Sequence, residues 1–233
     1  MTVELLIEAG LRACRNPAMA PAAEPYGNLR SQVLSQEGFD AAEHEIQQWP
    51  GYRTTPLLML PALARQLGVA SVLYKDEGAR FALKSFKALG GAYAVYRLLA
   101  QVIMAHNGGR PVSAAEVLAG RWRDVVRHIT VTCATDGNHG RSVAWGAQMF
   151  GCRCVIYIHA TVSEGRRAAI ARFGAEVVRV PGNYDDSVRH ANVQARAHGW
   201  TVVSDTTHER PQPWLRQAPQ GGARKLGSGP AFP

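Results

Sequence analysis

Residues 129–159, ITVTCATDGNHGRSVAWGAQMFGCRCVIYIH, decide the fold class of this chain. The β-branched run at 129–134 predicts a strand, and a second run at 153–159 predicts another. Between them, residues 138–150 have the length and the apolar spacing of a helix. Two strands joined by one helix form a parallel unit with a right-handed crossover. The stretch therefore predicts an α/β protein with a parallel sheet.

The same alternation continues toward the C-terminus. Helices are predicted at residues 163–173 and 185–198, and strands at residues 175–180 and 201–204. Together with the first unit, these elements specify an open parallel sheet. The pattern stops at residues 206–233, which are rich in Pro and Gly and have no apolar periodicity, so we expect an irregular tail there.

Upstream of the alternating elements, a long helix is predicted at residues 85–101, where apolar positions recur every three or four residues. The other predicted features are helices at 38–49 and 62–67, a turn-rich segment at 52–61, a strand at 71–75, and a surface excursion with one short helix at 105–124. We divide the chain into an N-terminal arm with a leading helix (1–55), an α/β region (56–205) and the tail (206–233).

The composition fits a globular protein and says little about partners. Of the 233 residues, 46% are hydrophobic, and 26 Lys and Arg against 18 Asp and Glu give a formal net charge of +8. The basic residues are scattered along the chain, so we expect no nucleic-acid partner. The longest apolar runs are interrupted by basic residues or histidine, so we expect no membrane-spanning helix.

The N-terminus and the cysteines indicate a cytoplasmic protein. Glu4 and Glu8 interrupt the first apolar stretch and no basic segment precedes it, so we expect no secretory signal. Cys152 and Cys154 lack a second Cys or His pair at metal-ligand spacing, so we expect no metal site. All four cysteines read as reduced thiols: Cys14, Cys133, Cys152 and Cys154.

Two loops have the form of ligand-binding segments. In open parallel sheets, ligands bind where strands end and helix N-termini begin. The first candidate is KDEGARFALKSFKALGG at residues 75–91, and the second is CATDGNHG at residues 133–140. In the second loop, Gly137 and Gly140 permit close approach of the backbone, and Asn138 supplies a donor and an acceptor.

Lys87 is the candidate reactive residue of the first loop. It lies in the first turn of a predicted helix, where the helix dipole disfavours a cation and favours loss of the proton, as a Schiff-base amine requires. The alternative is a surface lysine whose stem covers apolar neighbours. Asp136 and Asn138 have alternatives of their own, as a turn former and a helix N-cap.

Taken together, SFKALGG and DGNHG resemble the fold-type II family of pyridoxal-phosphate enzymes, which includes threonine dehydratase and tryptophan synthase β. Within it, RFALKSFKALGG at 80–91, the acid before GNHG and NYDDSVRHA at 183–191 resemble the diaminopropionate ammonia-lyases. The resemblance covers about residues 26–205. It implies an open parallel sheet in three layers, with residues 56–205 as the cofactor-binding α/β region: part of the large domain plus the small domain.

The resemblance also implies roles for single residues. Lys87 would carry pyridoxal 5'-phosphate as a Schiff base, and Asn138 would hydrogen-bond the phenolic oxygen of its ring. Asp136 and Asp205, in ATDGNHG and VVSDT, match the positions of proton-transfer groups in the ammonia-lyase. The remaining residues expected at the cofactor are Phe86, Gly137, His139 and Gly140.

The implied activity is α,β-elimination of 2,3-diaminopropionate to pyruvate and two ammonia, a step of amino-acid catabolism. The implied partners are a small amino-acid substrate and, in the full-length family, a second copy in a homodimer. A serine or threonine dehydratase shares the lysine and asparagine motifs and stays an alternative. So does a non-catalytic fragment of the family.

The chain departs from the family after residue 205. The family holds the cofactor phosphate in a glycine-rich loop well downstream of the asparagine loop, and the chain stops before such a loop. Gly221 and Gly222 follow no predicted strand and precede no predicted helix. We therefore expect a fold truncated at its C-terminus, with residues 206–233 as a non-native tail.

Overall fold

The computed structural model describes residues 27–205. Its centre is a sheet of four strands: β3 (Thr130–Ala134), β4 (Arg153–His159), β5 (Glu176–Val180) and β6 (Thr201–Val202). The strand order is β5-β4-β3-β6, and every neighbouring pair is parallel. The parallel sheet expected from the alternating sequence is therefore confirmed.

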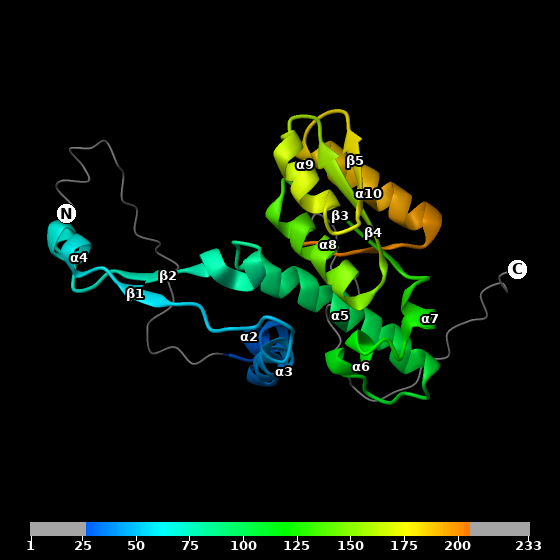
Figure 1. Ribbon diagram of the computed structural model, residues 1–233, viewed down its shortest axis with the longest axis horizontal. Helices are drawn as coiled ribbons and strands as arrows, with labels where there is room; N and C mark the ends of the chain where they lie inside the picture. The colour runs from blue at the N-terminus through cyan, green and yellow to red at the C-terminus, as the bar shows by residue number, and fades with distance from the viewer. Residues whose placement is uncertain (1–26, 206–233) are drawn as a thin grey trace, which may run out of the picture.

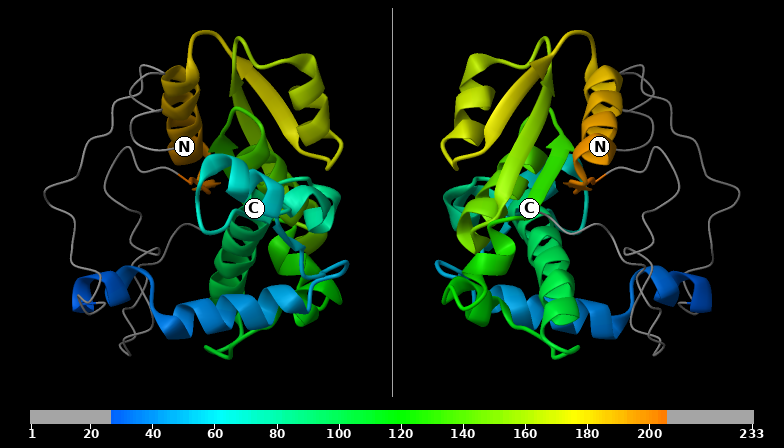
Figure 2. Two further views of the ribbon diagram at one scale, coloured as in Figure 1. Left: turned by 90° about the vertical axis from the view of Figure 1, so that its left-hand side faces the viewer. Right: turned by 90° about the vertical axis from the view of Figure 1, so that its right-hand side faces the viewer.

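Helices cover both faces of this sheet (Figures 1 and 2). On one face lie α8 (Asn138–Phe150) and α9 (Glu164–Ala171), and on the other lies α10 (Tyr184–His198). The bounds of all three helices lie within two residues of the predicted ones. The C-terminal ends of α8 and α10 are marked in the sequence by glycines, which form left-handed C-caps. The three layers implied by the resemblance are present.

The two faces of β4 show how the layers are held. Ile156 and Ile158 are fully buried in the larger hydrophobic cluster, which includes α8. Val155 and Tyr157 point the other way, into a smaller cluster with Ala191 of α10. Side chains alternate along a strand, and a strand buried on both faces is apolar throughout. This explains the continuous apolar run that first indicated the fold.

The long helix α5 (Lys87–His106) packs against α8 at very short range. A Cβ added to Gly146 would lie 2.8 Å from the Cα of Ala92, and one added to Gly91 would lie 2.5 Å from Ser142 Oγ. Ser142 Oγ also accepts a hydrogen bond from the Ala92 amide, 3.2 Å away. Glycine at these two positions is what allows the helices to touch.

Within residues 27–205, α5 is the one helix that is long and apolar enough, by length and composition, to cross a membrane. The sequence analysis expected none. Half of its most apolar 18-residue stretch is buried inside the protein. A core helix of a soluble protein can have the same length and composition. This feature therefore gives little support to a membrane span.

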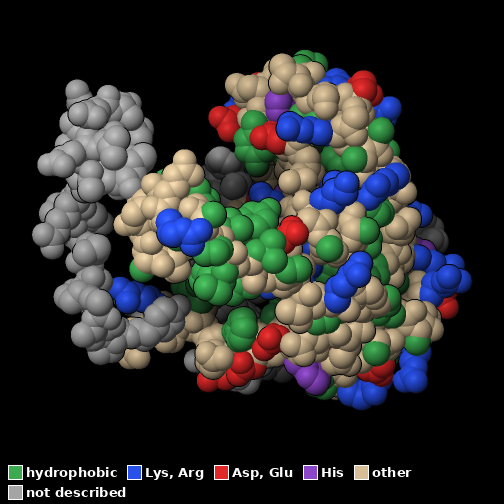
Figure 3. Space-filling model, turned by 60° about the vertical axis from the view of Figure 1, so that its left-hand side comes forward, with side chains coloured by type: hydrophobic (Ala, Val, Ile, Leu, Met, Phe, Trp, Pro, Cys, Tyr) green, Lys and Arg blue, Asp and Glu red, His purple; other side chains and the backbone are tan. Residues whose placement is uncertain are grey.

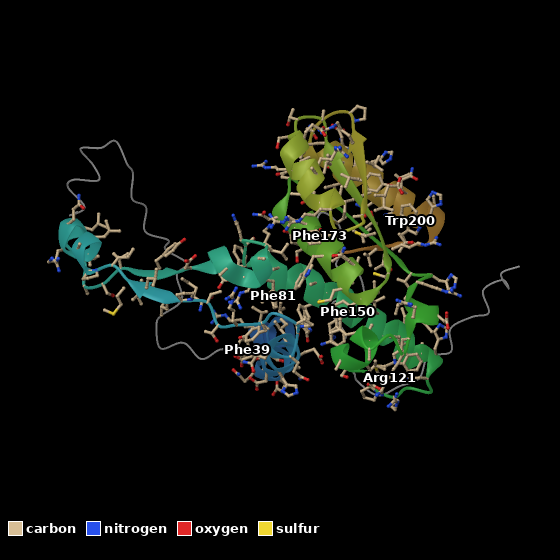
Figure 4. The ribbon with its side chains drawn as sticks, viewed as in Figure 1. Phe39, Phe81, Arg121, Phe150, Phe173 and Trp200 are labelled. Carbon is tan, nitrogen blue, oxygen red and sulfur yellow. The ribbon has the colours of Figure 1, made fainter. Side chains whose placement is uncertain are left out.

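The N-terminal elements lie at one side of the sheet domain. They are α2 (Asn28–Val33), α3 (Gln36–Gln47), β1 (Leu57–Met59), α4 (Pro61–Leu67) and β2 (Leu73–Lys75). Trp49, which follows α3, joins this helix to the core, with its ring 6.0 Å from that of Phe81 and 5.8 Å from that of Phe150 at the end of α8. Figure 4 labels both phenylalanines. The leading helix is confirmed, and it starts slightly earlier than expected.

β1 was not predicted, because residues 52–61 read as turns. It pairs antiparallel with β2, with Leu58 opposite Tyr74. This hairpin and α4 project from the N-terminal end of α5 away from the sheet (Figure 1). Most of Leu57 and Met59 is exposed, and apolar side chains gather on the face that Figure 3 brings forward.

The segment between α5 and β3 is less superficial than expected. It forms two short helices, α6 (Ala114–Leu118) and α7 (Arg123–Val126), where the sequence indicated one. Val112, Val117 and Val126 are buried in the main cluster. The prediction of a surface excursion was therefore wrong in part.

Residues 1–26 and 206–233 lie outside the described residues. The expectations for the N-terminal arm, for Cys14 and for the tail with Gly221 and Gly222 fall there.

Candidate active site

A cleft of about 550 Å³ lies where the strands of the parallel sheet end and α5 and α8 begin. Its volume is in the range typical of small-molecule sites. Six of the residues predicted from the two loops and the resemblance line it: Lys87, Asp136, Gly137, Asn138, His139 and Asp205. Segments far apart in the sequence thus meet at one site, as the rule for parallel sheets predicts.

Lys87 and Asp205 form an ion pair in this cleft. Lys87 is the first residue of α5, Asp205 follows β6, and Nζ lies 2.6 Å from Oδ2. Partial burial alone would raise the pKa of Asp205. The hydrogen bond from Lys87 and the nearby charges of His139 and Lys87 outweigh burial, and they hold the pKa of Asp205 below its usual value.

His139 supports the same carboxylate from α8. Its Nδ1 lies 3.7 Å from Asp205 Oδ2, and its Nε2 lies 2.8 Å from the carbonyl oxygen of Val203. Because a carbonyl only accepts hydrogen bonds, Nε2 carries a proton and donates it. The buried ring is thereby fixed with Nδ1 toward Asp205.

Thr135, which the sequence analysis did not select, shapes the loop before α8. Its buried hydroxyl accepts hydrogen bonds from the amides of Gly137 and Gly140, both at 3.0 Å. Gly137, which has no side chain, is the N-cap of α8, so Asn138 is not the capping residue of the alternative interpretation. Asn138 is exposed, and its side chain makes no hydrogen bond to the described part of the chain, which leaves it available to a ligand.

Two residues expected at the cofactor do not line the cleft. The side chain of Phe86 is 64% exposed and lies outside the lining, although Lys87 is its neighbour. Gly140 packs inward, since a Cβ there would lie 2.4 Å from Thr135 Cγ2 and 3.0 Å from Ile156 Cγ2. The cofactor-binding roles of Phe86 and Gly140 stay predictions, and Gly140 has in addition a packing role.

Besides Thr135, three lining residues with long polar side chains were not predicted: Arg141, Arg166 and Tyr184. Arg166 and Tyr184 lie in the first turns of α9 and α10, which follow β4 and β5, so the rule that located the first two loops could have found them. Arg141 donates to the carbonyl of Leu83 at 2.7 Å, while its buried Nε has no partner among the described residues. Burial lowers the pKa of Arg141.

The loop that leads to Lys87 is fixed by a partly buried cluster. Arg80 donates to Glu77 from Nε at 2.7 Å and from Nη2 at 2.9 Å, and Thr55 donates to Glu77 Oε1 at 2.5 Å. Mainly through the hydrogen bonds from Arg80, this cluster lowers the pKa of Glu77 to about 2. These hydrogen bonds fix the short 3-10 helix η1 (Glu77–Ala82), which precedes α5. They thereby help to fix the start of α5, where Lys87 lies.

The described part of the chain contains no group of three His, Cys, Asp or Glu residues placed to hold a metal ion. Cys152 and Cys154 are free thiols, and burial raises the pKa of both.

The fold and the site together define a class of enzyme. Residues 48–221 match the family described as "Pyridoxal-phosphate dependent enzyme", and the chain belongs to that family. The match runs past residue 205, into the segment that the sequence analysis set apart as a non-native tail.

Within the family, the chain is similar to diaminopropionate ammonia-lyases. It is 41% identical to the one from Escherichia coli (strain K12) over 184 residues, 79% of this chain and 45% of that protein. It is 36% identical to the one from Salmonella typhimurium, over 75% of this chain and 44% of that protein. The crystal structure of the Escherichia coli enzyme in complex with D-serine matches with a TM-score of 0.69 and 39% identity, over 79% of this chain and 46% of that one. The chain spans less than half the length of these relatives.

Proposed function

We propose that the cleft is part of the active site of a pyridoxal-phosphate-dependent ammonia-lyase that converts 2,3-diaminopropionate and water to pyruvate and two ammonia. The observation that carries the proposal is the ion pair of Lys87 and Asp205 beside Asn138, within a chain similar to diaminopropionate ammonia-lyases. The substrate is taken from those relatives. A homodimer rests on the resemblance and a cytoplasmic location on the N-terminus and the cysteines, and both stay predictions.

The residues of the cleft fit pyridoxal phosphate. Lys87 offers an amine to the aldehyde, and the guanidinium groups of Arg141 and Arg166 are suited to an anionic group. The unpartnered Nε of Arg141 is the kind of orphaned donor that a bound anion satisfies. When bound, the cofactor supplies an electron-withdrawing ring that stabilises negative charge at the substrate α-carbon.

The chain's own residues would then bind, orient and move protons. Asn138 would hold the phenolic oxygen of the cofactor ring through its amide. Asp205 would take the proton from Lys87 Nζ, because the two groups already share a 2.6 Å hydrogen bond. Asp136, on the loop between β3 and α8, would remove the proton from the α-carbon of one substrate stereoisomer.

Absorption spectroscopy tests the cofactor site. The purified chain with added pyridoxal phosphate should develop the visible band of a covalent lysine adduct, and Lys87→Ala should abolish it. Lys84→Asn is the matched control, because Lys84 is an exposed lysine three positions away with a φ of 53° that Asn tolerates. If the band fails to form in the wild-type chain, or survives in Lys87→Ala, the proposal is wrong.

Substrate profiling tests the reaction. Pyruvate and ammonia should form from 2,3-diaminopropionate and not from serine. Release from serine or threonine instead would favour the dehydratase, which shares the Lys87 and Asn138 motifs. A band without turnover of any of these amino acids would indicate a fragment that binds the cofactor without catalysis.

A further inference from the structure

His159 is a second histidine beside a carboxylate of the cleft, and neither the two motifs nor the resemblance selects it. It is the last residue of β4, and its Nε2 lies 2.9 Å from Oδ1 of Asp136. We propose that His159 is a positioning residue that fixes the Asp136 carboxylate at the mouth of the cleft. The catalytic importance of this position rests on the proposed function.

The ring of His159 has a second hydrogen-bond partner, Thr161. Its Oγ1 lies 3.1 Å from Nδ1 of His159, on the opposite side of the ring from Asp136. An ionised carboxylate only accepts, so a neutral His159 must carry its proton on Nε2 and accept from the Thr161 hydroxyl at Nδ1. The chain of donors runs from Thr161 through His159 to Asp136.

This arrangement fixes one oxygen of Asp136 and leaves the other available. Oδ1 is held by His159, and Oδ2 has no hydrogen bond to the described residues. The Asp136 side chain is 64% exposed, whereas that of His159 is only 17% exposed. A carboxylate in solvent would otherwise sample several rotamers, and a base acts efficiently only when it is held in line with the proton it removes.

The backbone that carries His159 and Thr161 is itself fixed. Arg179 of the neighbouring strand β5 donates from Nη1 to three carbonyl oxygens of this turn: His159 at 3.3 Å, Ala160 at 2.9 Å and Val162 at 2.7 Å. Its Nη2 pairs with Glu164 in the first turn of α9. Because one guanidinium group binds three carbonyl oxygens of this turn, the turn is restrained. The position of the His159 ring relative to Asp136 is therefore restrained as well.

The test of the hydrogen-bond direction uses the full chain without cofactor or substrate. NMR of the 15N-labelled ring reports which nitrogen of each histidine is protonated. We expect the Nε2–H form for neutral His159, its retention in Thr161→Ser, and a loss of that preference in Asp136→Ala, which removes the acceptor at Nε2. His139 is the internal control, because its Nε2 donates to Val203 in every variant. A dominant Nδ1–H form of His159, or no change in Asp136→Ala, would overturn the proposal.

Kinetics test the consequence for Asp136. His159→Ala should lower kcat about ten- to a hundredfold for the stereoisomer that Asp136 deprotonates, with little change in KM and no loss of the visible band, as expected for a displaced base. His159→Gln should recover most of that kcat, because its amide can replace the Nε2 donor. Unchanged turnover of both stereoisomers in His159→Ala would contradict the proposal. A wild-type chain with no band or turnover would contradict the proposed function instead, and the NMR result would still decide whether His159 fixes Asp136.

Discussion

Two carboxylates line the cleft, and each lies beside a histidine in a different way. Asp205 lies between the ammonium of Lys87 and the ring of His139, and its side chain is 32% exposed. Asp136 is bound by His159 alone and is twice as exposed, at 64%. A carboxylate paired with a cation is suited to holding that cation and sharing its proton, whereas one with a free oxygen is suited to receiving a proton from a ligand. The difference suggests that the two acids do separate tasks.

Removal of the Asp205 charge should have the largest effect on turnover. If Asp205 acts on Lys87, every substrate depends on it. Asp205→Asn should therefore lower kcat for both stereoisomers of 2,3-diaminopropionate by about 10²- to 10⁴-fold, the usual contribution of a proton-transfer group. Steady-state pyruvate release measures this, and a variant that loses activity toward one isomer only would refute a shared role.

Removal of the Asp136 charge should have a narrower effect. Asp136→Asn should lower turnover of one stereoisomer about a hundredfold and leave the other near the wild-type rate, because the second acid still serves it. The assay is the same with each pure isomer. Equal losses with both isomers would show that the two acids are not divided in this way.

The loop that carries Asp136 can be destabilised at Thr135 while both carboxylates stay in place. Thr135→Val leaves the buried amides of Gly137 and Gly140 without their acceptor and should lower the free energy of unfolding by about 2 kcal/mol. Thr132→Val is the matched control, since the Thr132 hydroxyl is buried on β3 with no partner among the described residues. Its replacement should be neutral or stabilising. Urea denaturation measures both, and equal effects would rule out this role for Thr135.

The smallest effect expected is on the pH dependence of stability. Because folding lowers the pKa of Asp205, its ion pair stabilises the protein above the ordinary carboxyl pKa, and this contribution is lost as the pH falls through the lowered value. The partly exposed pair should contribute less than about 1 kcal/mol. Denaturation midpoints across the acid range should fall less steeply in Asp205→Asn than in the wild type. An identical slope would show that the pair contributes nothing.

The alternating half of the fold could be predicted because its signals are local. From residue 129 onward each strand is a short run rich in β-branched residues and each helix has a regular apolar spacing, so the order and type of these elements needed no tertiary information. The hairpin strand β1 carried no such signal. Leu57–Met59 lies between Pro56 and Pro61, exposes its side chains and becomes a strand only through its pairing with β2.

The candidate site divides in the same manner. Lys87 and Asn138 stand in motifs that a reader can recognise, and Asp205 followed from the resemblance. His159 could not be found, because a single histidine at the end of a strand acquires a partner only when the sheet places it beside Asp136. Phe86 was expected at the cofactor through the resemblance carried by SFKALGG, and it lies outside the lining of the cleft although it directly precedes Lys87.

The contact between α5 and α8 has a mechanical consequence. Lys87 is the first residue of one helix and Asn138 the first of the other. Gly91 and Gly146 let these helices approach until Ser142 and Ala92 fill the space beside them, so neither helix can slide or separate without losing this close contact. Lys87 and Asn138, the two residues expected to bind the cofactor, therefore lie on helices that move as one unit. The distance between the two residues depends on the absence of a side chain at Gly91 and Gly146.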